Sequence, residues 1–159
     1  LVEKYVSDAV RYYLLREIPP IQDGDFSTRR FDEIYNSDLA NTLGNLVSRI
    51  TNLCEKNNIT IKEVDEIPDV KVSKLTEEYK FSLALEDIWK KLSDLNIEIN
   101  KNSPWNLKEN EAVKYLTNCV LKIRNIVINL KPYLPDTTEQ ILKATKGKIQ
   151  KIDPLFPRK

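Results

Sequence analysis

Apolar and polar positions alternate at helical spacing through residues 36–52, N-S-D-L-A-N-T-L-G-N-L-V-S-R-I-T-N. At about 100° per residue, the apolar side chains of this segment fall on one helix face, namely Leu39, Leu43, Leu46, Ile50 and Leu53. The opposite face carries three amides and one guanidinium, from Asn41, Asn45, Arg49 and Asn52. An amide offers a donor and an acceptor together, and a guanidinium offers a planar fork of donors, so this face suits hydrogen bonding to base edges.

The same periodicity predicts helices over residues 2–18, 28–56, 76–99, 109–130 and 136–145. In the first of these, the pattern places Val6 and Val10 on the inner side, followed by either Tyr13 or Leu14. Residues 36–38 predict a cap or a kink within the long second region, so that it forms two collinear or bent helices. Residues 57–72 are predicted to be a loop with at most one short turn.

Local signals define several helix ends. Ser27 is expected to be an N-cap, with Phe26 and Phe31 spaced as a hydrophobic staple. Asp136 and Glu139 have the spacing of a capping box for the last helix. The tail from about residue 148 is expected to run extended and to anchor through its apolar pair at 155–156. The sequence therefore predicts an all-α fold, an antiparallel bundle of about five helices with an extended C-terminal tail.

Composition narrows the possible functions. A net charge of +1 means that any contact with RNA must come from a local patch. The lack of histidine removes the commonest general base and metal ligand. Cys54 and Cys119 lie on apolar stripes and are predicted to be buried free thiols, typical of a reducing compartment. No apolar run approaches the ~18 residues of a membrane span. Because the chain has no methionine, we expect it to be a fragment of a larger protein.

The sequence contains no glycine-rich phosphate loop, no metal-ligand cluster and no nucleophile triad. We therefore expect this chain alone to be catalytically inactive. The amide-rich face also has an ordinary explanation, since fourteen asparagines make asparagine common throughout the chain. An unremarkable solvated face and a binding face both fit the pattern of residues 36–52.

The two tryptophans have different settings. Trp89 lies at the margin of an apolar stripe and is predicted to be in the core. Trp105 belongs to no stripe and follows Pro104 in the polar segment N-K-N-S-P-W-N-L of residues 100–107. It either caps the core or forms a platform on which an unstacked base can lie, as in many proteins that bind single-stranded RNA.

Several motifs carry a family resemblance, and they occur in order over nearly the whole chain. They are D-A-V-R-Y-Y-L-L-R-E (8–17), D-G-D-F-S (23–27), N-S-D-L-A-N-T-L-G-N-L-V-S-R (36–49), S-P-W (103–105), L-K-P-Y-L-P (130–135) and L-F-P-R (155–158). Together they resemble the C-terminal α-helical, anticodon-binding domain of methionyl-tRNA synthetases. The related domains of cysteinyl, leucyl, isoleucyl and valyl enzymes share the bundle but not these motifs. The family's K-M-S-K-S and H-I-G-H motifs are absent from the given sequence.

This resemblance implies that Asn45, Arg49 and Trp105 bind the CAU anticodon of the methionine-specific tRNA. It also implies that residues 1–26 form a junction helix and turn next to the catalytic domain, and that residues 27–159 form the anticodon-binding domain. No cofactor or metal is expected in this chain, because the family's methionine, ATP–magnesium and zinc sites would lie in the absent catalytic part. The implied partners are tRNA and the catalytic domain of the same chain, without membrane or DNA, and the implied location is the cytoplasm.

Two alternatives remain open from the residues. The chain could be the anticodon-binding domain of a sibling synthetase for another amino acid. It could also be a helical protein-interaction domain with no role in RNA binding.

Overall fold

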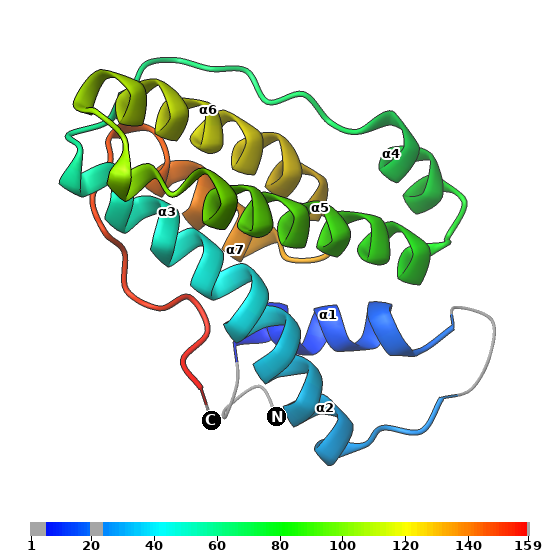
Figure 1. Cartoon of the computed structure of the whole chain (residues 1–159). Coiled ribbons are helices and arrows are strands. Elements are labelled where there is room, and N and C mark those ends of the chain that lie inside the picture. Colours follow the sequence, from blue (N-terminus) through cyan, green and yellow to red (C-terminus); the bar gives the residue numbers. More distant parts are fainter. Residues whose placement is uncertain (1–5, 20–23, 159) are drawn as a thin grey trace.

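A computed structural model describes residues 6–19 and 24–158 (Figure 1). Its elements are α1 (Ser7–Glu17), α2 (Thr28–Ile34), the π-helix η1 (Tyr35–Gly44), α3 (Asn45–Lys56), β1 (Thr60–Ile61), α4 (Val70–Glu77), α5 (Phe81–Asn102), the 3-10 helix η2 (Pro104–Asn106), α6 (Glu109–Val127), the 3-10 helix η3 (Ile128–Leu130), α7 (Pro135–Ala144) and β2 (Gly147–Lys148). The predicted all-α bundle is confirmed.

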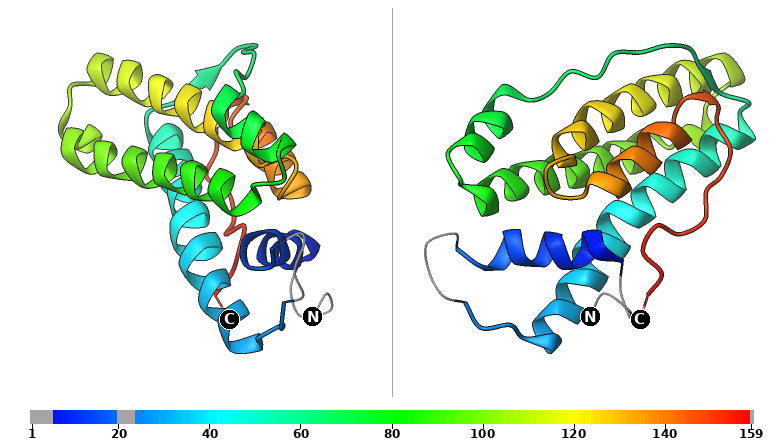
Figure 2. Two further views of the ribbon diagram at one scale, coloured as in Figure 1. Left: turned by 90° about the vertical axis from the view of Figure 1, so that its right-hand side faces the viewer. Right: turned by 180° about the vertical axis from the view of Figure 1, so that it is seen from behind.

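The helices pack around one continuous core. The segments α2, η1 and α3 form one long rod, and α5 and α6 lie side by side and cross it (Figures 1 and 2). Helix α4 packs on the first part of α5. Helix α1 contacts the same part of α5, and also contacts η1 and α7. The chain from Ile149 to Arg158 runs extended along the rod (Figure 2). Its apolar pair anchors it as predicted, because Phe156 is buried and Leu155 is partly buried against the core.

The longest apolar stripes predicted from the sequence form the core. Leu39, Leu43, Leu46 and Ile50 of the rod are buried, as are the stripe residues of α5 from Ala84 to Ile99. Cys54 and Cys119 are buried and free, which confirms their predicted state. Trp89 is also part of the core. These positions follow the helical period closely because each helix buries only one face.

Helix α1 confirms its predicted inner side only in part, and residues 2–5 of the predicted helix lie outside the described residues. Tyr13, one of the two alternatives, is buried, as is Tyr12. Val6 and Leu14 are instead 53% and 42% exposed. The Tyr12 ring lies 4.7 Å from that of Trp89, centroid to centroid. Burying aromatic rings removes more apolar surface from water than burying the aliphatic side chains would, so the aromatic face turns inward.

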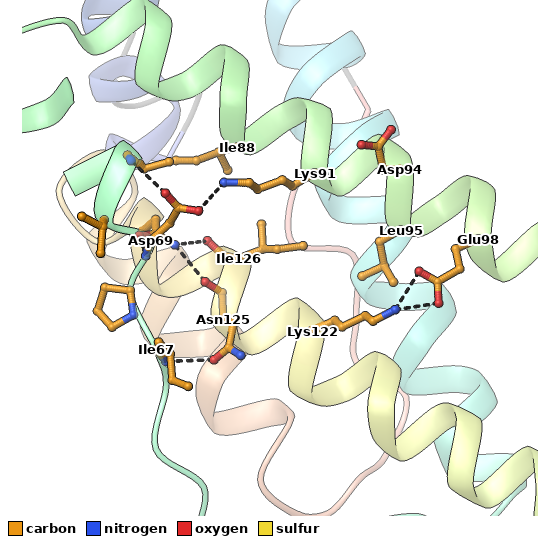
Figure 3. Close-up of a pocket in the computed structure, with 14 residues that line it drawn as sticks. Ile67, Asp69, Ile88, Lys91, Asp94, Leu95, Glu98, Lys122, Asn125 and Ile126 are labelled. Carbon is orange, nitrogen blue, oxygen red and sulfur yellow. Dashed lines mark hydrogen bonds and ion pairs between the residues drawn. The ribbon is translucent and has the colours of Figure 1, made fainter. Parts of the chain in front are cut away.

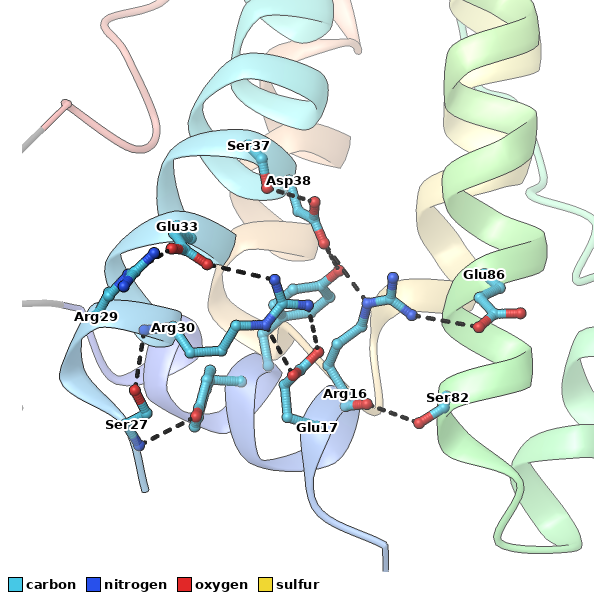
Figure 4. A network of polar contacts seen from close by, with 12 residues as sticks. Arg16, Glu17, Ser27, Arg29, Arg30, Glu33, Ser37, Asp38, Ser82 and Glu86 are labelled. Atoms are coloured by element: carbon cyan, nitrogen blue, oxygen red, sulfur yellow. Dashed lines mark hydrogen bonds and ion pairs between the residues drawn. The ribbon is translucent and has the colours of Figure 1, made fainter. Parts of the chain in front are cut away.

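Polar contacts fix α1 to its neighbours (Figure 4). The Tyr12 hydroxyl donates to Asp38 over 2.8 Å, and burial together with that carboxylate raises the pKa of Tyr12. Arg16 lies between Asp38 at 3.6 Å and Glu86 at 3.9 Å, and so links α1 to both η1 and α5. Glu17 accepts two hydrogen bonds from the guanidinium of Arg30 in α2.

The junction of α1 and α2 agrees with the local signals. The Ser27 hydroxyl accepts from the Arg30 amide at 3.2 Å, which confirms Ser27 as the N-cap. The rings of Phe26 and Phe31 lie 6.0 Å apart and form the predicted staple. In contrast, the predicted capping box at Asp136 is wrong. Pro135 begins α7 and Leu134 is its N-cap, because proline suits the first helical position and leaves Asp136 inside the first turn.

The cap or kink predicted at residues 36–38 does not form, because the rod continues through this segment as a π-helix. The long second region is nevertheless made of collinear helices, which is one of the two arrangements predicted (Figure 1). The local polar side chains bond within the helix instead of ending it. The Asn36 amide donates to Asp32 O at 2.9 Å, and the Thr42 hydroxyl donates to Ser37 O at 3.0 Å. Gly44 closes this segment, and a Cβ at that position would lie 3.0 Å from Leu39 O. The wider turn of the π-helix therefore explains the glycine.

We expect Gly44→Ala to destabilise the protein by about 1–3 kcal/mol, because the added methyl group would meet backbone that cannot move independently. Urea unfolding measures this change. Ser48→Ala, also on the rod, serves as the control and should stay within about 0.5 kcal/mol of the parent. A stabilisation of about 1 kcal/mol, as helix propensity alone would give, would show that Gly44 is not constrained.

The segment predicted as a loop contains more structure than expected. Thr60 and Ile61 pair with Lys148 and Gly147 as two short antiparallel strands. Helix α4 starts after Asp69, whose carboxylate caps it at the Val72 amide. The helix predicted from residue 76 instead begins at Phe81, because the chain turns through Tyr79 in the left-handed region with φ of 60°.

Candidate nucleic-acid interface

Two of the three predicted site residues meet across the bundle. Arg49 lies one turn after Asn45 on α3, and its Cζ atom is 5.4 Å from the ring centroid of Trp105. Such a distance is within the range of a cation–π interaction. Asn45 is exposed on the same face of α3, and Trp105 is 53% exposed. The three side chains therefore come from two separate parts of the chain and reach the same surface region.

The local backbone explains how Trp105 reaches solvent. Helix α5 ends at Ser103 in the left-handed conformation, with φ of 46°. Pro104 is buried and begins η2, a single turn closed by the Asn106 amide donating to Ser103 O at 2.8 Å. This turn packs on α6, so the residue between Pro104 and Asn106 projects outward. The Trp105 ring is thus more than half exposed and lies outside the core cluster.

Arg49 has two partners that the sequence pattern did not reveal. Asn96 Oδ1 accepts from Nη1 at 2.9 Å, and Asn100 Oδ1 accepts from Nη2 at 2.7 Å. These asparagines lie one turn apart on the polar side of α5. Their spacing of four residues was visible in the sequence, but only the packing of α5 against the rod shows that they face Arg49.

A pocket of about 380 Å³ adjoins these residues between the rod and α5. Its lining combines amides and hydroxyls with two aliphatic side chains, from Asn41, Thr42, Asn45, Leu46, Arg49, Ser93, Asn96 and Ile97. Ile97 is 63% exposed even though it is aliphatic. Apolar surface beside paired donors and acceptors can hold a planar heteroaromatic group, because such a group has apolar faces and polar edges.

The other asparagines of the amide-rich face have different roles. Asn41 accepts a hydrogen bond from Arg158 of the tail at 2.7 Å, so part of its amide is already engaged. Asn52 is partly buried. A second hollow of about 560 Å³ lies between the rod and the tail, and Asn45 lines both it and the first pocket.

A further groove of about 610 Å³ lies over α5 and α6, beneath the segment that precedes α4 (Figure 3). Both of its lysines are paired with carboxylates of the lining. Lys91 contacts Asp69 at 2.5 Å, and the hydrogen bond from Lys91 lowers the pKa of Asp69. Lys122 contacts Glu98 at 2.7 Å. Since both positive charges are neutralised, the groove offers less to an anionic ligand than the surface around Arg49 does.

Two other kinds of feature are absent from the part of the chain that the structure describes. Within 6–19 and 24–158, no three histidine, cysteine or acidic side chains gather as a metal ion would require. In that same part of the chain, each helix is too short or too polar to cross a membrane.

Comparison with known proteins identifies the class of protein to which this chain belongs. Residues 70–157 match the model described as the anticodon-binding domain of tRNA ligase, and residues 1–51 match that of tRNA synthetases class I (M). A helix bundle with an exposed Arg–Trp–amide surface is consistent with such a domain. The curated methionine–tRNA ligases of Fusobacterium nucleatum and Bacillus subtilis are 38% and 32% identical, over 88% and 99% of this chain. The chain belongs to the methionyl-tRNA synthetase family.

Solved structures agree with this assignment. The apo methionyl-tRNA synthetase of Mycobacterium tuberculosis superposes with a TM-score of 0.81 and 25% identity, covering 99% of this chain and 40% of that protein. The chain spans 25% of the length of the Fusobacterium nucleatum relative and 30% of the Bacillus subtilis one.

Proposed function

We propose that this chain recognises the CAU anticodon of methionine tRNA as part of a methionine–tRNA ligase, which joins methionine to its tRNA with ATP. Family membership supports this proposal. The methionyl-tRNA synthetase of Mycobacterium tuberculosis, which has the same fold, is bound by methionyl-adenylate, whose AMP part is consistent with the use of ATP. In this proposal, methionine, ATP with magnesium, and zinc bind to other parts of the parent enzyme in the cytoplasm, and this chain is catalytically inactive alone.

The observation that carries the proposal is the meeting of Arg49 and Trp105 beside Asn45. An unstacked base can lie on the exposed indole of Trp105. The amide of Asn45 can pair with a Watson–Crick edge, and the guanidinium of Arg49 can bond a base or a phosphate. Splayed loop bases are the usual target of sequence-specific RNA recognition.

A binding titration tests this function directly. A labelled RNA stem-loop with the CAU anticodon should bind, and its affinity should fall as salt rises because phosphate contacts release counterions. Stem-loops with each anticodon base changed are the controls. Retained binding of a stem-loop in which the CAU anticodon is replaced by another would favour a sibling synthetase. Absence of salt-dependent binding to the stem-loop and to complete tRNA would favour a protein-interaction domain.

We expect Arg49→Lys to weaken binding of the CAU stem-loop by about 1–2 kcal/mol, because an ammonium keeps the charge but loses the planar fork held by Asn96 and Asn100. Fluorescence anisotropy measures the loss. Lys56→Arg, on the same helix but outside the site, is the matched exchange and should have no effect. Unchanged affinity of Arg49→Lys would reduce Arg49 to a general electrostatic contact.

We further propose that the N-terminal segment, residues 1–26, transmits geometry between the catalytic part and this bundle. The support is the network joining Tyr12 and Arg16 of α1 to Asp38 of the rod (Figure 4). Since Asp38 precedes Asn45 on the same continuous rod, a displacement of α1 would be passed toward the site.

A further inference from the structure

The arginines of this protein differ in what holds them. Several are paired with carboxylates: Arg16 with Asp38 and Glu86, Arg29 and Arg30 with Glu33, Arg30 also with Glu17, and Arg124 with Glu66. Arg49 also forms two hydrogen bonds, both to α5. Its two acceptors, however, are neutral amide oxygens and not carboxylates. Among the residues that the structure describes, no carboxylate forms an ion pair with Arg49.

The chemistry of the guanidinium fixes the orientation of both amides. A guanidinium has five N–H donors and no acceptor, so each asparagine must turn its oxygen toward Arg49. The two bonds, at 2.9 Å and 2.7 Å, use one N–H from each terminal nitrogen and leave the other three N–H groups for a ligand. They hold the planar group beside the ring of Trp105.

We propose that Asn96 and Asn100 are positioning residues of the RNA site, which orient Arg49 beside Trp105 without neutralising its charge. This inference rests on the proposed function and names the means by which Arg49 acts. A carboxylate at either position would hold Arg49 more tightly through a charge-assisted bond. It would also cancel the charge that attracts a phosphate or an electron-rich base edge, and would add a negative charge beside the RNA. Amide acceptors provide the orientation and keep the full positive charge.

Asn100→Asp separates the orientation of Arg49 from the neutralisation of its charge. The substitution keeps the size of the side chain and its acceptor oxygen but adds a negative charge. It should leave thermal stability unchanged or raise it, because the new ion pair replaces a neutral hydrogen bond. It should weaken binding of the CAU stem-loop about tenfold or more at low salt. The slope of log affinity against log salt should become less steep by about 0.7, the value for one lost contact with single-stranded RNA. A merely structural role would move stability and affinity in the same direction.

The alanine variants test whether the asparagines act through Arg49. Asn96→Ala and Asn100→Ala should each lower affinity on the order of threefold to tenfold, the range of one hydrogen bond. In an Arg49→Ala background the same changes should have almost no further effect, because residues that act through one another are not additive. Asn118→Ala, an exposed asparagine on α6, is the control and should not change affinity.

The affinities of these variants either support or contradict a positioning role for Asn96 and Asn100. Parent-like affinity of Asn100→Asp, or an undiminished effect of Asn100→Ala when Arg49 is alanine, would overturn it. The indole N–H signal of Trp105 in a nuclear magnetic resonance spectrum gives a measurement without RNA. Asn96→Ala and Asn100→Ala should shift this signal, whereas Asn118→Ala should not. If the parent itself does not bind the stem-loop, the proposed function fails, and an unmoved indole signal would then reject the positioning role as well.

Discussion

Replacing Trp105 with alanine is expected to weaken binding of the CAU stem-loop by about 1–3 kcal/mol, a tenfold to hundredfold loss of affinity. The indole is exposed and belongs to no part of the core, so its main energetic contribution should come from stacking on a base. Its removal also deprives Arg49 of the ring beside it. Stability should change by about 0.5 kcal/mol or less, as for most surface substitutions.

Anisotropy titrations with the labelled stem-loop measure this effect, and urea unfolding checks that the fold is retained. Trp105→Phe keeps a smaller aromatic face and should recover part of the affinity. Tyr79→Ala removes another exposed aromatic ring, at the turn between α4 and α5, and should bind like the parent. If Trp105→Ala bound as tightly as the parent, the stacking role would be wrong.

Arg124→Ala is expected to destabilise the protein by about 3–5 kcal/mol, the largest change in stability expected here. The Arg124 side chain is only 6% exposed and links three segments of the chain. Its Nη1 atom donates to Leu142 O at 2.7 Å and to Thr145 Oγ1 at 3.0 Å, and its Nη2 atom donates to Glu66. Alanine would leave these acceptors without their donor and would open a cavity between α6 and α7.

Urea unfolding followed by circular dichroism measures this loss. Arg124→Met is the informative companion, because it fills most of the volume with an apolar group and should cost less than alanine. Lys114→Ala, an exposed position on α6, should be nearly neutral. A cost below about 1 kcal/mol for Arg124→Ala would mean that water replaces the guanidinium without penalty.

The sequence predicts best where one strong period dominates. The stripe of α5, from Ala84 to Ile99, and that of α6, from Ala112 to Val127, have the burial expected, since each helix packs by one face. Val113 is an exception: it lies at the edge of the α6 stripe and is exposed. Helix α1 was harder to predict because aliphatic and aromatic side chains compete for its inner face. The aromatic partners of Tyr12 and Tyr13 lie on other segments of the chain.

Other features depend on partners that are distant in sequence. A strand of two residues has no alternation to detect, so the pairing of Thr60 with Lys148 was not predictable. The π-helix also escaped prediction, because one of its contacts, the hydrogen bond of Asp38 with Tyr12 of α1, joins residues 26 positions apart. For the same reason the sequence predicts Arg49 as a site residue but not its partners on α5, which lie about fifty positions later.

The contacts of α1 also have a consequence for how the chain folds during synthesis. The Asp8 carboxylate is buried and accepts from the Thr137 amide at 2.7 Å, 129 residues later, and Arg11 donates to Pro132 O across 121 residues. A ribosome completes the N-terminal helix early but supplies these partners only near the end of the bundle. Asp8 and Arg11 therefore lack these partners until the segment up to α7 has emerged. The rings of Tyr12 and Tyr13 can be covered earlier, because their aromatic neighbours lie in α5, in α2 and just before α2. Such late closure of long-range contacts slows folding relative to bundles whose contacts are local.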